Sequence, residues 1–114
     1  MRFSQRSGPQ PLSGQVFQIL LSLADGPRHG YAIILDVRTR SRGEIQLTTS
    51  TLYDALSRMV DAGWIGSVDA PPAERDPRRR YYELTPAGRV TALQEAARLD
   101  RLLACAREKN LLPL

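Results

Sequence analysis

The sequence predicts a mainly α-helical domain that carries one small β-hairpin and ends in a long helix. Apolar residues recur at helical spacing in several segments between residues 12 and 108. A proline-rich segment at 70–79 separates two short segments of strand character, which is typical of a hairpin. The chain has 114 residues, of which 42% are apolar and 25% charged, so it is long enough for one globular core and too short for two.

The charge of the chain favours a polyanionic partner without identifying one. The net charge is +4, and Lys109 is the only lysine among 16 basic residues. Arginine suits phosphate and guanine because its planar guanidinium forms paired hydrogen bonds. A GC-rich genome that favours arginine codons explains the same composition equally well, so charge alone does not decide the function.

The composition also excludes several classes of protein. The single cysteine, Cys105, excludes an internal disulfide and a cysteine-based zinc site, and the single histidine, His29, excludes a multi-histidine metal site. We expect His29 to serve a helix start and Cys105 to be a small buried residue rather than a redox sensor. No catalytic motif is present, so we expect no enzyme activity and no cofactor. The sequence shows neither a secretory signal nor an apolar run that spans a bilayer, so we expect a cytoplasmic protein without membrane contact.

The first predicted helix is unusually apolar. We interpret residues 1–11 as a flexible basic arm, and the helical pattern begins at Leu12 and ends at residues 25–27. One stripe follows the spacing of a single face, and a second, adjacent stripe doubles its width. A small domain needs one such stripe for its own core. The width therefore predicts an additional contact, most simply with a partner chain. The first stripe is Val16, Ile19, Leu20 and Leu23, and the second is Phe17, Leu21 and Ala24.

A second helix is predicted over residues 30–40, with Tyr31, Ile34 and Leu35 facing inward. Three arginines gather near its end, where cations complement the helix dipole. A capping role and a phosphate-contacting role are equally supported there. After this helix the alternation of residues 45–47 predicts one short strand. The three arginines are Arg38, Arg40 and Arg42, and the strand would contain Ile45 and Leu47.

The third predicted helix, residues 49–62, divides into two faces. At 100° per residue its apolar side chains fall on one side, and small hydroxyls, acids and one arginine fall on the other. An open face of this kind can contact base edges and phosphates. The inner side contains Leu52, Ala55, Leu56, Met59 and Val60. The open side contains Ser50, Thr51, Asp54, Ser57, Arg58 and Asp61, with Tyr53 on a flank.

A basic hairpin follows the third helix. The outgoing strand contains Trp64, Ile65 and Val68, and in the return strand we expect Tyr82 and Leu84 inward with Tyr81 more exposed. A helix followed by a charged hairpin suits a DNA duplex, because the helix fits the major groove and the hairpin reaches the flanking phosphates. The candidate contacts in the hairpin are Arg75, Arg78, Arg79, Arg80 and Tyr81.

The last helix begins at Thr85-Pro86, an N-cap hydroxyl followed by proline at the first helical position, and runs to about residue 109. Its apolar residues drift around the helix instead of forming one stripe. Pairing with the first helix and with a second copy of the chain would bury this surplus, so we expect a homodimer. The predicted dimer interface contains Val16, Phe17, Leu20, Leu21, Val90, Leu93, Ala97, Leu102, Leu103 and Ala106.

Four motifs in this order resemble the PadR family of bacterial transcriptional regulators, and the resemblance covers roughly residues 12–108. They are Pro27 to Ile33, Ser50 to Met59, Gly63 to Ile65, and Arg79 to Gly88. The resemblance implies a winged helix-turn-helix domain at 12–84 and, as in the shorter subfamily, one C-terminal dimerisation helix within 85–114. It implies a homodimer that binds double-stranded DNA at a pseudo-palindromic operator, usually as a repressor. It also implies release by a stress signal or by a small-molecule effector of unknown identity.

Two positions depart from the family pattern. Ser50 stands where the family usually has glycine, and Asp54 stands where it often has proline after the tyrosine. The serine adds a side chain where the backbone approaches DNA, and the carboxylate can accept a hydrogen bond from cytosine N4 although it repels phosphates. Asp54 and Asp61 on the open face keep a second function open, a winged-helix module that binds proteins and has no specific affinity for DNA.

Overall fold

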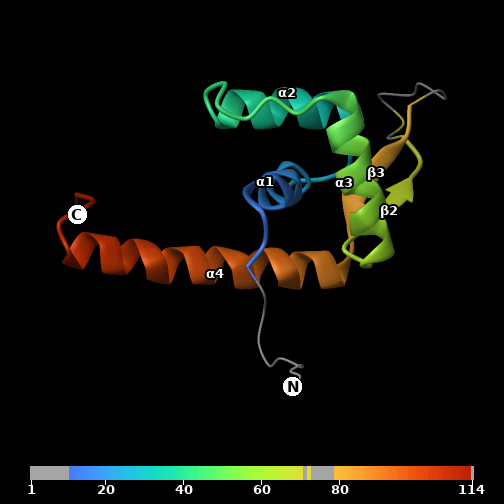
Figure 1. Ribbon diagram of the computed structural model, residues 1–114. Coiled ribbons are helices and arrows are strands. Elements are labelled where there is room, and N and C mark those ends of the chain that lie inside the picture. Colours follow the sequence, from blue (N-terminus) through green and yellow to red (C-terminus); the bar gives the residue numbers. More distant parts are fainter. Residues whose placement is uncertain (1–10, 71, 73–78, 114) are drawn as a thin grey trace, which may run out of the picture.

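The computed structural model describes residues 11–70, 72 and 79–113 (Figure 1). The predicted arm, apart from residue 11, and two of the candidate hairpin arginines, Arg75 and Arg78, lie outside these residues. The predicted class is confirmed: the described residues form four helices and a small three-stranded antiparallel sheet at one end of the molecule (Figure 1). The elements are α1 (Gly14–Ser22), β1 (Arg28–His29), α2 (Gly30–Arg40), α3 (Thr49–Asp61), β2 (Ile65–Val68), β3 (Tyr81–Leu84) and α4 (Pro86–Glu108).

Helix α1 lies at the centre of the molecule. It begins two residues later than predicted, because the Ser13 side chain accepts a hydrogen bond from the backbone N–H of Val16 and caps the helix there. Helices α2 and α4 pack on it from two sides (Figure 1). As a result Ile19 and Leu20 are completely buried, and α1 supplies the middle of the core.

Helix α2 has the predicted bounds but a different inner face. Ile33 and Val37 are fully buried, whereas Tyr31 is 58% exposed and Leu35 is 37% exposed. The prediction that these last two residues face inward is therefore wrong. The two-residue strand directly before α2 explains the error, because its pairing with the sheet fixes the rotation of the helix, and the helix's own apolar pattern does not.

Helix α3 follows its predicted pattern closely. Its buried residues are Leu52, Ala55, Leu56 and Met59, as expected, although Val60 is 41% exposed. The helix ends at Asp61, and Gly63 follows it with a φ of 82°, a conformation that favours glycine. The backbone N–H of the next residue then donates to the carbonyl of Met59, so the chain turns directly into the sheet.

The sheet has the order β1-β3-β2, so β3 is its central strand (Figure 1). Tyr81 and Tyr82 are therefore both buried, at 2% and 5% exposure, and the prediction that Tyr81 is exposed is wrong. The ring of His29, on the neighbouring strand β1, packs edge to face with the ring of Tyr81. The predicted strand at Ile45 and Leu47 is also wrong, since residues 45–48 form no strand and the additional strand is β1.

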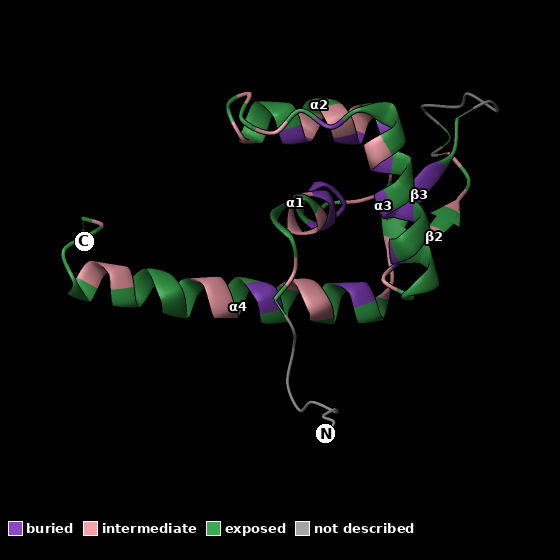
Figure 2. Ribbon diagram, in the orientation of Figure 1, coloured by how far each residue is buried: buried purple, intermediate pink, exposed green. Residues whose placement is uncertain are grey.

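Helix α4 is anchored at its start and exposed beyond it. Thr85 caps the helix through Gly88, as predicted, and its backbone N–H donates to the carbonyl of Trp64. Gly88 allows this approach, because a Cβ at that position would collide with the same carbonyl oxygen. The following part of α4 packs on α1, but residues 100–105 are all exposed (Figure 2).

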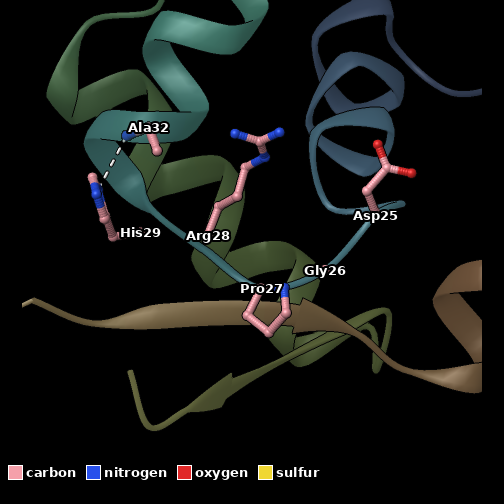
Figure 3. Close-up of a pocket in the computed structure, with 6 residues that line it drawn as sticks. All are labelled: Asp25, Gly26, Pro27, Arg28, His29 and Ala32. Atoms are coloured by element: carbon pink, nitrogen blue, oxygen red, sulfur yellow. Dashed lines mark hydrogen bonds between the residues drawn. The ribbon is translucent and has the colours of Figure 1, made fainter. Parts of the chain in front are cut away.

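Three arginines from three different elements donate hydrogen bonds to backbone carbonyls near the C-terminal end of α1. Arg28 Nε lies 2.7 Å from the carbonyl oxygen of Ser22, and Figure 3 shows its side chain between α1 and α2. The other two carbonyl bonds are Arg40 to Gln18 at 2.7 Å and Arg89 to Ala24 at 2.9 Å. Cations here complement the negative end of the α1 dipole and satisfy its terminal carbonyls. The side chain of Arg40 thus binds α1, a contact that neither of its two predicted roles included.

Candidate nucleic-acid interface

The open face of α3 presents the side chains that the sequence placed there. Ser50, Asp54, Ser57 and Arg58 are exposed, and Tyr53 is 43% exposed. The opposite face of α3 is committed to the core, so the helix rests firmly on the domain. A fixed helix with hydroxyl, carboxylate and guanidinium groups on its outer side has the form required to enter a major groove.

The first turn of α3 is shaped by hydroxyl groups. Thr48 caps the helix, because its Oγ1 accepts a hydrogen bond from the backbone N–H of Thr51 at 3.1 Å. The same oxygen lies 2.9 Å from Oγ1 of Thr51 and 3.4 Å from Oγ of Ser50. Thr51 is only partly exposed and shares this capping network, so Ser50 presents the more accessible hydroxyl.

Tyr53, at the edge of the open face of α3, packs against the start of α2. A Cβ placed on Gly30 would lie 2.5 Å from the hydroxyl oxygen of Tyr53 and 3.3 Å from a methyl carbon of Leu52. The glycine therefore allows the tyrosine ring to pack over the first turn of α2. The phenol is held at the junction of the two helices, at the edge of the open face.

A shallow groove of about 300 Å³ runs between α3 and the hairpin. Arg80 and Tyr82 line it from the sheet, and Ser57 and Asp61 line it from the helix. Burial raises the pKa of the Tyr82 phenol, although the positive charge of Arg80 opposes the increase. The phenol therefore stays neutral at physiological pH, and the positive charge of Arg80 faces the groove beside the recognition helix.

Arg79 extends from the other side of the hairpin strand. Its Nη1 lies 2.6 Å from Nε2 of His29, and it is exposed at the end of the sheet. Of the predicted hairpin contacts, Arg80 thus lies beside α3, whereas Arg79 lies against His29. Tyr81, in contrast, is buried between strands, so its predicted place on the contact surface is wrong.

The predicted dimer surface is mostly present on the outside of the chain. Leu21 is 37% exposed, Leu93 is 64% exposed and Leu102 is 54% exposed. Leu20 is an exception, because it is completely buried in the core and its place in an interface is wrong. Cys105 is exposed and not buried as expected, because it lies on the outer part of α4. The remaining predicted interface residues are partly or fully exposed: Val16, Phe17, Val90, Ala97, Leu103 and Ala106.

Within the described residues we find no group of three or more potential metal ligands. The helices of that part of the chain include none with the length and apolarity needed to cross a membrane. His29 has the helix-start role expected of it, since its Nδ1 accepts a hydrogen bond from the backbone N–H of Ala32 (Figure 3).

The fold and the exposed basic face define a winged helix domain, in which α2 and α3 form the helix-turn-helix and β2 and β3 form the wing. Residues 19–94 match the model of the PadR-like family of transcriptional regulators. This match covers more than half of the chain. The chain therefore belongs to the PadR-like family of transcriptional regulators.

Known proteins similar to this chain agree with that family. A PadR family transcription regulator from hypervirulent Clostridium difficile is 25% identical with a TM-score of 0.68, and the match covers 82% of this chain and 95% of that one. Bacillus subtilis PadR, solved in complex with operator DNA, is 22% identical with a TM-score of 0.57 over 68% of this chain and 43% of that one. An uncharacterized 37.1 kDa protein in a transposon of Streptomyces fradiae is 38% identical over 84 residues, which are 74% of this chain. The match spans only 22% of that relative's length.

Proposed function

We propose that this chain forms a homodimer that binds a specific, pseudo-palindromic DNA operator and represses transcription from it. The observation that carries the proposal is the open face of α3 together with the groove beside it, which Arg80 lines from the sheet. Membership in a family of transcriptional regulators, and the operator complex of Bacillus subtilis PadR, support DNA as the partner. Such a regulator acts in the cytoplasm, where a small-molecule or stress signal would release it, as the family resemblance implies.

In this proposal the two parts of the surface have different tasks. Ser50, Tyr53, Asp54, Ser57 and Arg58 face the base edges, which differ between base pairs in the major groove. Arg79 and Arg80 face the phosphates, and Arg75 and Arg78, which lie outside the described residues, remain predicted contacts of the same kind. Contacts with phosphates position the protein on the duplex and carry no sequence information directly.

The outer part of α4 supports the homodimer. Leu102 and Leu103 are 54% and 45% exposed, and all of residues 100–105 are exposed to solvent. A helical segment without tertiary packing is only marginally stable in water. A second copy of the chain, packed along α4 and the exposed side of α1, would bury these side chains and stabilise the helix.

The proposal is tested by selecting binding sites from random duplex DNA with the purified chain. We expect one enriched site with two inverted halves, bound with a nanomolar-range Kd that increases steeply with salt, since bound arginines displace counterions. Equal affinity for selected and random DNA at moderate salt would contradict specific DNA binding. It would then favour the protein-binding module, for which Asp54 and Asp61 on the open face provide acidic groups.

The dimer is tested separately by sizing. The wild-type chain should elute as a dimer at micromolar concentration, and Leu103→Glu should elute as a folded monomer because it places a charge in the interface. A wild-type monomer under these conditions would contradict the homodimer. Asp100→Glu, on the same exposed segment, keeps the charge and serves as the matched control.

A further inference from the structure

His29 is held from several directions at the junction between α2 and the sheet. Its backbone lies in β1 opposite Tyr81, and its Nδ1 accepts a hydrogen bond from the N–H of Ala32 at 3.1 Å. Its ring meets the ring of Tyr81 edge to face, with centroids 5.3 Å apart and an interplanar angle of 89°. Because Tyr81 is itself buried, the imidazole is attached to a rigid part of the domain.

This fixed ring contacts an arginine of the wing. Arg79 Nη1 lies 2.6 Å from Nε2 of His29 and 3.5 Å from its Nδ1, although the two residues are 50 positions apart in the sequence. Arg79 stands two residues before β3, where a long side chain has considerable rotamer freedom. The imidazole therefore restricts where the guanidinium lies relative to α2 and α3.

The chemistry of the contact links the wing to the start of α2. A neutral imidazole has one acceptor nitrogen, whereas a guanidinium is only a donor. The N–H of Ala32 approaches Nδ1 and Arg79 approaches Nε2, so the two donors compete for the acceptor through the tautomer of His29. One tautomer cannot accept both bonds, so His29 exchanges between capping α2 through Nδ1 and accepting from Arg79 through Nε2. Loss of Arg79 should then favour the tautomer with hydrogen on Nε2.

We propose that His29 is a positioning residue for the wing, which holds Arg79 beside the start of α2 so that this guanidinium meets the DNA backbone in register with α3. The proposal rests on the DNA binding proposed above. Arginine carries five N–H donors, so one guanidinium can contact an imidazole and a phosphate together. His29 thus contributes to DNA affinity through Arg79 without itself touching a base.

Arg80, the next residue along the chain, provides a matched comparison. Its side chain lines the groove between α3 and the sheet together with Tyr82. It is as exposed as Arg79 and carries the same charge. A role of His29 that acts through Arg79 should therefore be independent of Arg80.

The first test is a double-mutant cycle on DNA affinity. Asparagine is a good N-cap residue, so His29→Asn should retain the cap of α2 and the melting temperature, but its side chain is too short to hold Arg79. We expect His29→Asn to weaken binding to the selected operator by about threefold to tenfold in the wild-type background. It should have no further effect in Arg79→Ala, and it should retain its full effect in Arg80→Ala. Equal effects in all three backgrounds, or none in the wild type, would overturn the positioning role.

The second test needs no DNA. At about pH 8, where an imidazole is neutral, Arg79→Ala should move the ring nitrogen chemical shifts of His29 towards the tautomer with hydrogen on Nε2, while Arg80→Ala should leave them unchanged. Unchanged shifts in Arg79→Ala would overturn the proposal even if the chain binds its operator normally. A wild-type chain that binds no DNA would instead overturn the proposed function, and the role of His29 with it.

Discussion

The end of α1 and the face formed by α3 and the wing both carry arginines, but the chain uses them differently. At the end of α1, Arg28, Arg40 and Arg89 donate to carbonyl oxygens of the same chain at 2.7–2.9 Å. On the other face, Arg58 and Arg80 are exposed beside the recognition surface. The acceptors around each guanidinium, and not the net charge of +4, determine which arginines are available to a phosphate.

The largest expected effect is a loss of stability, which only the arginines at the end of α1 should produce. Arg40→Ala removes hydrogen bonds to the side-chain oxygen of Gln18, to its carbonyl and to the hydroxyl of Ser22, together with an ion pair to Asp36 at 2.6 Å. We expect the free energy of unfolding to decrease by about 2 kcal/mol, because some acceptors are left unsatisfied. Denaturant unfolding measures this change.

Arg38→Ala provides the control for that experiment, because it removes an exposed arginine from the same helix. Its stability should remain close to that of the wild type. If both variants were equally stable, the network at the end of α1 would contribute nothing and the comparison would fail.

The next effect appears in DNA affinity and not in stability. Replacing Arg79 and Arg80 together by alanine should weaken binding to every sequence by about tenfold or more, and lower the slope of log affinity against log salt by about two. Fluorescence anisotropy over a range of salt concentrations measures both quantities. An unchanged slope would show that these two guanidinium groups contact no phosphate.

A smaller effect concerns the choice of sequence. Arg58→Ala should reduce discrimination between the selected operator and single-base variants by about 1 kcal/mol, roughly fivefold, at the positions that it contacts. Competition binding with a set of operator variants measures this discrimination. Uniform weakening on all variants would instead assign Arg58 to the phosphates, together with the wing.

The smallest expected effect is a change in stability at acidic pH. Burial by itself would raise the pKa of Asp36, but hydrogen bonds from Arg40 and Ser22 outweigh it and leave the pKa below the usual value of 3.8. Because the folded pKa is the lower one, the pair stabilises the protein above pH 3.8 and the contribution is lost as pH decreases through the folded pKa. For a pair at the surface, the loss should stay below about 1 kcal/mol. Unfolding of the wild type and of Asp36→Asn between pH 6 and pH 3 should differ in slope only at the acidic end; parallel slopes would contradict the pairing.

The sequence alone predicted which residues are buried where one face of a helix packs on the core of its own chain. In α3 the apolar residues Leu52, Leu56 and Met59 define the buried side, and the open side followed directly from the period of the helix. The Thr85-Pro86 start of α4 was predictable for a similar reason, since the capping hydroxyl and the proline act locally. Local chemistry and a clear period were enough in both places.

The remaining features depend on contacts between distant parts of the chain. Strand β1 is only Arg28–His29, too short to show any alternation, and only its pairing with β3 creates it. The burial of Tyr81 follows from that same pairing, which the pattern of β3 alone does not contain. The contact between His29 and Arg79 joins residues 50 positions apart, so only the folded topology reveals it. The run His29-Gly30 offered one local signal, a capping side chain followed by a small residue at a crowded helix start.

The close approach at Gly88 has a consequence for the whole assembly. Only Thr85 separates β3 from α4, and it is tied to the carbonyls of Gly63 and Trp64, at the end of the recognition helix. In a homodimer joined along α4, each winged helix domain would therefore rotate together with its own α4. The crossing angle between the two α4 helices would set the distance between the two α3 helices, and so between the operator half-sites that they bind. An effector that altered only this angle would change that distance and weaken binding.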